Sequence, residues 1–558
     1  MVGAWVLAQV ADLVTDAFNS PDWVIQMIIT LLVIGLPVSL LLSWAFDLTS
    51  DGLLRTGSGA GEGTLVVGSK SILALVAGLF LVLAVALFLF WPRGDRSIAV
   101  LPFDDVSPDG SQAYLGKGIA VEIRLRLQEL EGLRVAGETS SNAYATEDSR
   151  TIGEALDVGT ILEGNVRQDG SRVRITWQLI NAADGFTVTS GSYDRDLEQI
   201  FEMQTQIAAS VAGYLGVSLG VGGVNAFSGA GTESLDAYEA YLQARELGNG
   251  SAAIPLLERA TQIDPNYGVA WSRLALSLMS RWWVVNPEEI PELAERAYQH
   301  ALRGVELSPE SAESQSALAI AQMLQFDWIG AEQAHTLATD LLADRSTLGR
   351  YAVTQLRTGR VEEAKAKFRL AESIEPMGGL PLGLSWHASL AQGLVDEARE
   401  FRMRNMGLDF FEDNLDLAFN EDDPAAMIEA IRGLPETSPA YVHLFGPLLA
   451  DFDSPERILA LLQGVYEDEE LIWPRKLHDI AMAAAYFGHP RFSLQVKKVD
   501  IQTNPSRIVA IWYPVMSEVR QLTEFNEFVT ELNMVEYWKS YTWPDVCRPL
   551  DDKNFTCS

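Results

Sequence analysis

The chain has 558 residues, with 75 aspartate and glutamate residues against 41 lysine and arginine residues, and its formal net charge is -34. This length implies several domains, and the acidity argues against a general nucleic-acid-binding protein, because phosphate binding needs a basic surface. Two cysteines are too few for a disulfide-rich scaffold or for a metal site with several cysteine ligands.

Apolar residues are concentrated near the N-terminus, in three segments. Residues 24–46 and 71–91 contain no charged residue, and each reaches the roughly 20 positions that a bilayer-spanning helix needs. Residues 2–18 form a third, shorter candidate that carries two aspartates. We therefore expect transmembrane helices in these ranges, within a membrane segment over residues 1–91, and the lipid bilayer as a partner.

Basic residues do not fix the orientation of this segment. Arg55 and Lys70 flank the loop between the last two candidate spans, and Arg93 and Arg96 follow the last one. Three spans from a cytoplasmic start would place the C-terminal part outside the cytoplasm, whereas two spans would return it to the cytoplasm.

Residues 97–215 have the pattern of a small α+β domain. A short apolar run at 97–103 predicts a strand, and residues 112–130 have the periodicity of an amphipathic helix. Asp169 and Gly170 lie between two runs of alternating residues, which predicts a hairpin. The remaining elements are expected as strands at 133–136, 160–166, 173–180 and 186–192, and as helices at 152–156 and 197–215.

These segments resemble, in the same order, the TolB amino-terminal-like domain, which is also found in the FlgO-like group. The resemblance is carried by SIAVLPF (97–103), ILEGNVRQDGSRVRITWQLINAADG (161–185) and SYDRDLEQIFEMQTQIAASVAG (192–213). Residues 43–55, SWAFDLTSDGLLR, also resemble bacterial membrane proteins that join this domain to tetratricopeptide repeats. Some of those relatives carry a cyclase catalytic domain or a winged-helix DNA-binding domain, and neither pattern occurs in this sequence.

A glycine-rich linker at 216–232 precedes a region of helical repetition. Residues 233–410 match tetratricopeptide repeats, in which small residues let two antiparallel helices approach and a proline ends the second helix. After residue 410 the pattern weakens, and residues 411–558 are expected to form degenerate helical repeats and a C-terminal tail. The positions expected to pack the repeats are Trp271, Leu274, Ala275, Ala352, Ala364, Phe368, Ala371 and Pro376.

Stacked repeats of this kind form a solenoid with a concave face that binds peptides or proteins. The alternatives are a face filled by the chain itself and a solenoid that only supports a neighbouring domain. Trp282 and Trp283 are candidates either for anchoring a partner or for packing between helices. The sequence leaves the residues that contact a partner unknown.

Motifs that carry chemistry are missing from the sequence. The six histidines are not spaced as metal ligands, and Gly216–Gly220 spells Gly-x-Ser-x-Gly without the preceding strand that a nucleophile elbow needs. We therefore expect no catalytic residue, no metal site, no cofactor and no enzymatic activity.

Cys547 and Cys557 enclose a short segment near the C-terminus. Pro549 and the two aspartates that follow it favour a turn that would bring the thiols together. Cys547 and Cys557 are therefore a candidate disulfide, with two independent thiols and metal binding as the alternatives, and a disulfide would indicate an oxidising compartment.

The expected fold class is multi-domain: N-terminal transmembrane helices, a small α+β domain, then an all-α tetratricopeptide-type solenoid. The expected function is that of a membrane-anchored, non-catalytic scaffold in the bacterial inner membrane, with its large C-terminal part in the periplasm. Its partners would be membrane or periplasmic proteins and not nucleic acid. The alternative function is a signal-transduction component related to the cyclase-linked or winged-helix regulators.

Overall fold

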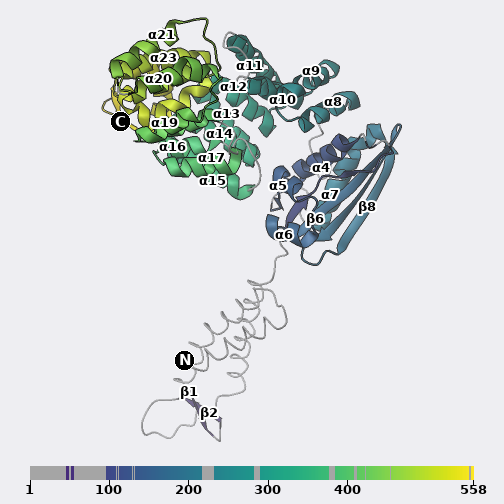
Figure 1. The fold of residues 1–558 in the computed structure, drawn as a ribbon. Coiled ribbons are helices and arrows are strands. Elements are labelled where there is room, and N and C mark those ends of the chain that lie inside the picture. The colour runs from purple at the N-terminus through teal and green to yellow at the C-terminus, as the bar shows by residue number, and fades with distance from the viewer. Residues whose placement is uncertain are drawn as a thin grey trace. The chain divides into compact units, whose positions relative to one another are not determined.

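The computed structural model describes residues 46–49, 52–55, 96–108, 110, 112–128, 130, 132–216, 231–281, 289–375, 384–406, 411–421, 423–452, 454–551 and 554–558. The chain divides into two compact units, Met1–Asp95 and Arg96–Ser558. Figure 1 shows the helices and strands within each unit.

In the first unit the described residues form a hairpin of two antiparallel strands, β1 (Phe46–Thr49) and β2 (Gly52–Arg55). No helix in the described part of the chain is long and apolar enough to cross a membrane. The expected fold class is therefore corrected: its N-terminal transmembrane helices are not supported. The ranges 2–18, 24–46 and 71–91 lie outside the described residues, except for Phe46, whose backbone pairs with Arg55 in a strand instead of continuing a helix.

The second unit begins with a sheet in the strand order β5-β3-β6-β7-β8, with β4 beside β6. β3 runs parallel to β5 and β6, whereas β6, β7 and β8 are antiparallel. Gly170 has a φ of 60° in the turn between β6 and β7, which matches the positive φ that tight hairpins need. The strands are β3 Ser97–Val100, β4 Asp104–Asp105, β5 Arg134–Val135, β6 Thr160–Asp169, β7 Arg172–Asn181 and β8 Thr187–Asp196.

Helices cover both faces of this sheet. Ile98 and Val100 pack on one side, with α4 (Ala113–Gln128) and α7 (Ile200–Tyr214), and α7 follows the short helix η1 (Leu197–Gln199). Ala99 and Leu101 pack on the opposite side, near α5 (Glu138–Ala143) and α6 (Ser149–Leu156). Because successive strand residues point to opposite faces and both faces are buried, residues 98–101 are all apolar.

The following helices pack as consecutive pairs and form an all-helical, repeat-like solenoid. The first helices of neighbouring pairs also contact one another, α10 with α12 and α12 with α14. The pairs are α8 Leu235–Glu246 with α9 Ile254–Ile263, α10 Gly268–Ser280 with α11 Ile290–Leu307, α12 Ala312–Leu324 with α13 Trp328–Leu341, α14 Arg345–Arg357 with α15 Val361–Ile374, and α16 Trp386–Ala391 with α17 Val395–Met406. A short helix, η3 (Ser251–Ala253), leads into α9.

The C-terminal part continues as shorter helices and ends in a two-stranded hairpin. Trp512, Trp538 and Trp328 join it to the solenoid, since their indole nitrogens donate to the carbonyls of Arg357, Thr358 and Leu532 at 2.8, 3.0 and 2.7 Å. Its elements are α18 Phe411–Phe419, α19 Pro424–Arg432, the π-helical turn η7 Tyr441–Phe445, α20 Gly446–Ala450, α21 Pro455–Glu467, α22 Lys476–Tyr486, α23 Pro490–Thr503, η8 Pro505–Trp512, η9 Pro514–Met516, α24 Ser517–Arg520, α25 Thr523–Glu531, α26 Met534–Ser540, β9 Cys547–Pro549 and β10 Phe555–Cys557.

Candidate functional site

The repeat positions singled out in the sequence lie at the contacts between helices. Trp271 is half-buried, its indole nitrogen donates to the carbonyl of Pro265 at 3.0 Å, and its ring lies 5.0 Å from that of His300. Pro376, Trp282 and Trp283 lie outside the described residues. The others are buried: Leu274, Ala275, Ala352, Ala364, Phe368 and Ala371.

Cys547 and Cys557 are joined by a disulfide with a sulfur–sulfur distance of 2.00 Å. The two residues face each other in the ladder between β9 and β10. Phe555, on β10, packs its ring against those of Trp538 and Trp543. The disulfide therefore fixes a strand that covers part of the C-terminal core.

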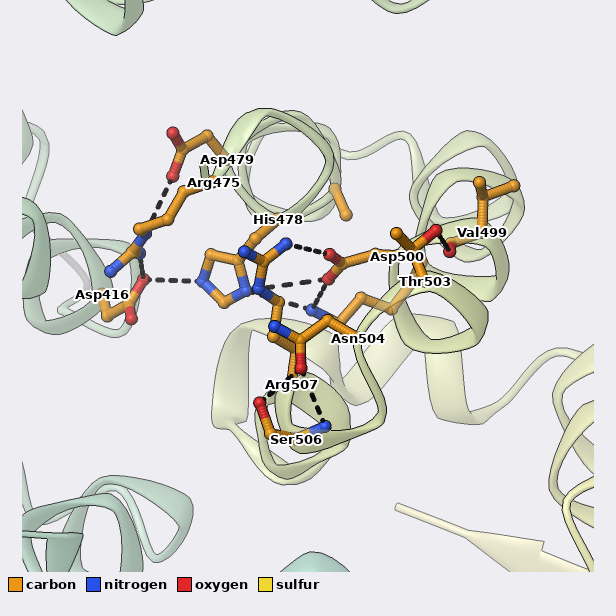
Figure 2. A network of polar contacts seen from close by, with 12 residues as sticks. Asp416, Arg475, His478, Asp479, Val499, Asp500, Thr503, Asn504, Ser506 and Arg507 are labelled. Carbon is orange, nitrogen blue, oxygen red and sulfur yellow. Dashed lines mark hydrogen bonds and ion pairs between the residues drawn. The ribbon is translucent and has the colours of Figure 1, made fainter. Parts of the chain in front are cut away.

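A second group of polar side chains is buried between α18, α22, α23 and η8, and we call it the buried ion network (Figure 2). The imidazole of His478 is at its centre, with Nε2 3.0 Å from Asp416 Oδ1 and Nδ1 3.1 Å from Lys497 Nζ. Because the ammonium donates to Nδ1, the ring is neutral and carries its proton on Nε2. The network consists of Asp416, Arg475, His478, Asp479, Lys497, Asp500 and Arg507.

Every carboxylate in this network has a cationic partner. Asp416 accepts from Arg475 at 2.7 Å, and Asp500 accepts from Lys497 at 2.6 Å and from Arg507 at 2.7 Å. Three carboxylates and three cations are thus present beside the neutral ring, and burying them is tolerable only because they are paired.

The pKa values in the network follow from these contacts. Burial, assisted by the charge of Lys497, lowers the pKa of His478 to about 4. Burial alone would raise the pKa of Asp500, but Lys497 and Arg507 outweigh it and lower that pKa to about 2. Among the described residues no group of three or more histidine, cysteine and acidic side chains is placed to hold a metal ion.

A further group of charged side chains lies on the first helices of the repeats. We call it the arginine face and define it as Arg245 on α8, Arg273 on α10, and Arg350 and Arg357 on α14. All four side chains are half-buried. Removing a guanidinium from water in this way is costly unless an anion or a hydrogen-bond acceptor faces it.

Two of these arginines have carboxylate partners. Arg245 is 2.8 Å from Glu138 of α5, and Arg124 of α4 lies 3.4 Å from the same carboxylate. Arg273 is 2.5 Å from Glu313 on α12, and its guanidinium lies 5.9 Å from the centre of the Tyr241 ring. Burial would raise the pKa of Glu138 and of Glu313, but the neighbouring arginines outweigh burial and lower both pKa values. Both carboxylates are therefore ionised at neutral pH.

The other two arginines have no carboxylate within ion-pairing distance among the described residues. Arg357 directs one guanidinium nitrogen to the sulfur of Met323 at 2.8 Å, and burial lowers its pKa to about 10. Burial likewise lowers the pKa of Arg350, while the more distant charges of Glu313 and Asp344 oppose the shift. A sulfur is a weak acceptor, so the guanidinium of Arg357 has no strong hydrogen-bond acceptor among the described residues, and that of Arg350 is matched only by carboxylates beyond ion-pairing distance.

The sequence analysis predicted neither the buried ion network nor the arginine face. Arg350 and Arg357 are seven positions apart on one helix, which places them on the same side two turns apart. That spacing, on the first helix of a repeat within an acidic chain, is the signal from which the arginine face could have been found. Asp416 and His478 are 62 positions apart, and no local pattern connects them.

No family model matches the chain. It is 31% identical over 208 residues to "Putative adenylate cyclase 3" of Rhizobium meliloti (strain 1021), and the match covers 35% of this chain and 35% of that protein. The chain therefore spans about a third of the length of this curated relative. The resemblance to the TolB amino-terminal-like domain stays a prediction.

Among solved structures, "Structure of Naa15/Naa10 bound to HypK-THB" is 14% identical to the chain and covers 56% of it, with 43% of that structure's chain covered and a TM-score of 0.21. This likeness is too low to carry an argument about the fold or the function.

Proposed function

We propose that this helical repeat protein is a non-catalytic scaffold that binds another protein through the first helices of its repeats. The observation that carries the proposal is the half-buried polar surface formed by Arg273, Arg350 and Arg357. An ordinary solvent-exposed face would leave such long side chains hydrated, whereas these are desolvated and only partly matched. Arginine is enriched at protein–protein interfaces and among the residues that contribute most to binding.

Site-specific photo-crosslinking in cells that express the full chain tests this proposal. A photoreactive amino acid at Val353, which is half-buried between Arg350 and Arg357 on α14, should form adducts with a particular protein. The matched control is Leu370 on the second helix α15, whose exposed fraction is 49%. The proposal requires that the protein crosslinked at Val353 also binds the purified chain, and that Leu370 does not capture it; equal capture at both positions would overturn it.

We further propose that the C-terminal part functions in an oxidising compartment, the bacterial periplasm. The bond between Cys547 and Cys557 supports this, because such bonds persist in the periplasm and are rare in the cytosol. When thiols are alkylated with a large maleimide reagent in intact, rapidly quenched cells, the mass of the chain should increase only if the disulfide has first been reduced. Immediate labelling of both cysteines would count against the periplasmic location.

A second candidate is a signal-transduction component, and the identity to a protein named as an adenylate cyclase favours it. In this role the chain would hold a separate cyclase or DNA-binding chain as its output partner. Mild purification of the full chain distinguishes the two functions: a stoichiometric cyclase or DNA-binding partner supports the second, and an envelope protein without either activity supports the first.

A further inference from the structure

We infer that the arginine face binds a short acidic segment of the partner protein, with one carboxylate at Arg350 and another at Arg357. This inference rests on the proposed scaffold function and adds the chemistry of the ligand. The occupant is a peptide segment with acidic side chains.

The chain's own carboxylates show what this face accepts. Glu138 lies against Arg245 at 2.8 Å and near Arg124, and Glu313 lies against Arg273 at 2.5 Å. Charge-assisted bonds between guanidinium and carboxylate are short and about twice as strong as neutral ones. Two of the arginine positions are thus already occupied by acids, while Arg350 and Arg357 on α14 have no carboxylate within ion-pairing distance among the described residues.

The spacing of the two unmatched arginines specifies the ligand further. Seven residues of an α-helix advance roughly 10 Å along its axis. A peptide in the polyproline II conformation has three residues per turn and advances about 3.1 Å per residue, so acidic side chains three positions apart lie on the same side and are separated by about 9 Å. The preferred ligand is therefore a segment in the polyproline II conformation with acids at positions i and i+3.

The charge of the whole chain limits how long this segment can be. The chain carries a formal net charge of -34, so a long acidic partner would be repelled. Charges more than a Debye length away, about 8 Å at physiological ionic strength, are largely screened. A short acidic segment can consequently bind the local arginines, whereas an extended polyanion such as a nucleic acid would meet unfavourable charge beyond them.

Fluorescence anisotropy with the purified full chain tests the inference. The probe is a fluorescein-labelled peptide of alanines with two glutamates three positions apart, and the matched peptide has glutamines instead. The glutamate peptide should bind at least tenfold more tightly, and the difference should shrink as the salt concentration rises. Equal binding of the two peptides, or tighter binding of an oligothymidine of similar length, would overturn the inference.

Variants assign the binding to the two arginines. Arg350→Glu and Arg357→Glu should each reduce the affinity for the glutamate peptide at least tenfold. Arg369→Glu, at an exposed position on α15, should change this affinity by less than twofold. Arg350→Gln removes the charge without adding a negative one and should give an intermediate loss with an unchanged melting temperature. Equal losses for Arg350→Glu and Arg369→Glu would refute the assignment.

Failure of the inference can be separated from failure of the scaffold function. If the protein crosslinked at Val353 binds Arg350→Glu as well as it binds the wild-type chain, the scaffold function stands and the inference that the partner binds through an acidic segment is wrong. If Val353 captures no specific protein at all, the scaffold function itself fails, whatever the peptides do.

Discussion

The ammonium of Lys497 lies 2.6 Å from the carboxylate of Asp500, and neither side chain is exposed to solvent. The same ammonium donates to Nδ1 of His478 at 3.1 Å. One buried cation thus neutralises an acid on its own helix, α23, and fixes the tautomer of a histidine on α22. Lys497 is thus the most buried cation of the network, since Arg475 and Arg507 are 16% and 14% exposed.

Replacing this lysine should therefore destabilise the C-terminal helices strongly. Lys497→Met removes a buried cation, leaves Nδ1 of His478 without a donor and leaves Asp500 with Arg507 alone. Loss of one partner from a buried pair costs about 3–5 kcal/mol, which urea unfolding followed by tryptophan fluorescence would measure.

The matched control is Lys117→Met. Lys117 also lies close to an acid, 2.5 Å from Glu246, but the two side chains are 51% and 40% exposed. An exposed pair contributes less than about 1 kcal/mol. If both substitutions reduce the free energy of unfolding by the same small amount, the buried ion network does not stabilise the fold as described.

The neutral state of His478 should make stability depend on pH. Burial and Lys497 lower its pKa from an ordinary 6.5 to about 4 in the folded chain. Between these values the unfolded chain binds the proton and the folded chain does not, so stability is full above pH 6.5 and falls as the pH decreases towards 4. The pKa of Asp500 is about 2, so this acid loses its contribution only at lower pH, below its ordinary value of 3.8.

Urea unfolding at pH 7 and at pH 4.5 isolates the histidine effect. Between pH 7 and pH 4.5 the free energy of unfolding should decrease by about 2 kcal/mol more for the wild-type protein than for His478→Gln, because a glutamine does not titrate. His443→Gln is the control, since His443 is exposed and lies outside the buried ion network. A His478→Gln protein with the full wild-type loss would show that other groups cause it.

The sequence predicted regular elements well where one pattern repeats over many residues. Alternating residues in β6 and β7, and small residues such as Ala352 and Ala364 in the repeats, follow from a pleated sheet and from close helix packing. Helix α5 was not expected, because Glu138–Ala143 is six residues long and mostly polar, with no apolar stripe.

The charged groups could not be predicted for a different reason. Asp416 is buried because the guanidinium of Arg475, 59 positions away in the sequence, reaches it. Arg245, Arg273 and Arg350 likewise belong to separate repeats and come together only when their helices stack. Pairings of this kind depend on tertiary packing, which local spacing does not encode.

The disulfide should stabilise the C-terminal part measurably. Cys547→Ser combined with Cys557→Ser frees a loop whose closure contributes about 3 kcal/mol. It also releases Phe555 from Trp538 and Trp543. Reductant should lower the melting temperature of wild-type protein and leave the double variant unchanged, and a wild-type protein insensitive to reductant would contradict this role.

Gly359 should tolerate an added methyl group less well than another glycine of the same conformation. Gly359 has a φ of +81°, and a Cβ placed there would lie 2.9 Å from Cβ of Pro544 and 2.9 Å from Cε2 of Trp512. Gly488 has a φ of +78° with nothing within 4 Å of such a Cβ. The strain of a left-handed alanine, about 1 kcal/mol, is common to both positions, so their difference reports the contact between the solenoid and the C-terminal part.

Gly359→Ala should therefore cost about 1–3 kcal/mol more than Gly488→Ala in urea unfolding, because neither the proline ring nor the buried indole can move without disturbing its neighbours. The backbone amide of Asp545 also donates to the carbonyl of Gly359 at 3.1 Å, so a shift of this turn loosens the tail. Tryptophan fluorescence is the appropriate signal, since Trp512 and Trp538 lie at this contact. If the two alanine variants lose the same free energy of unfolding, the segment around Pro544 moves aside without cost. The solenoid and the C-terminal helices would then be less tightly joined than their indole hydrogen bonds indicate.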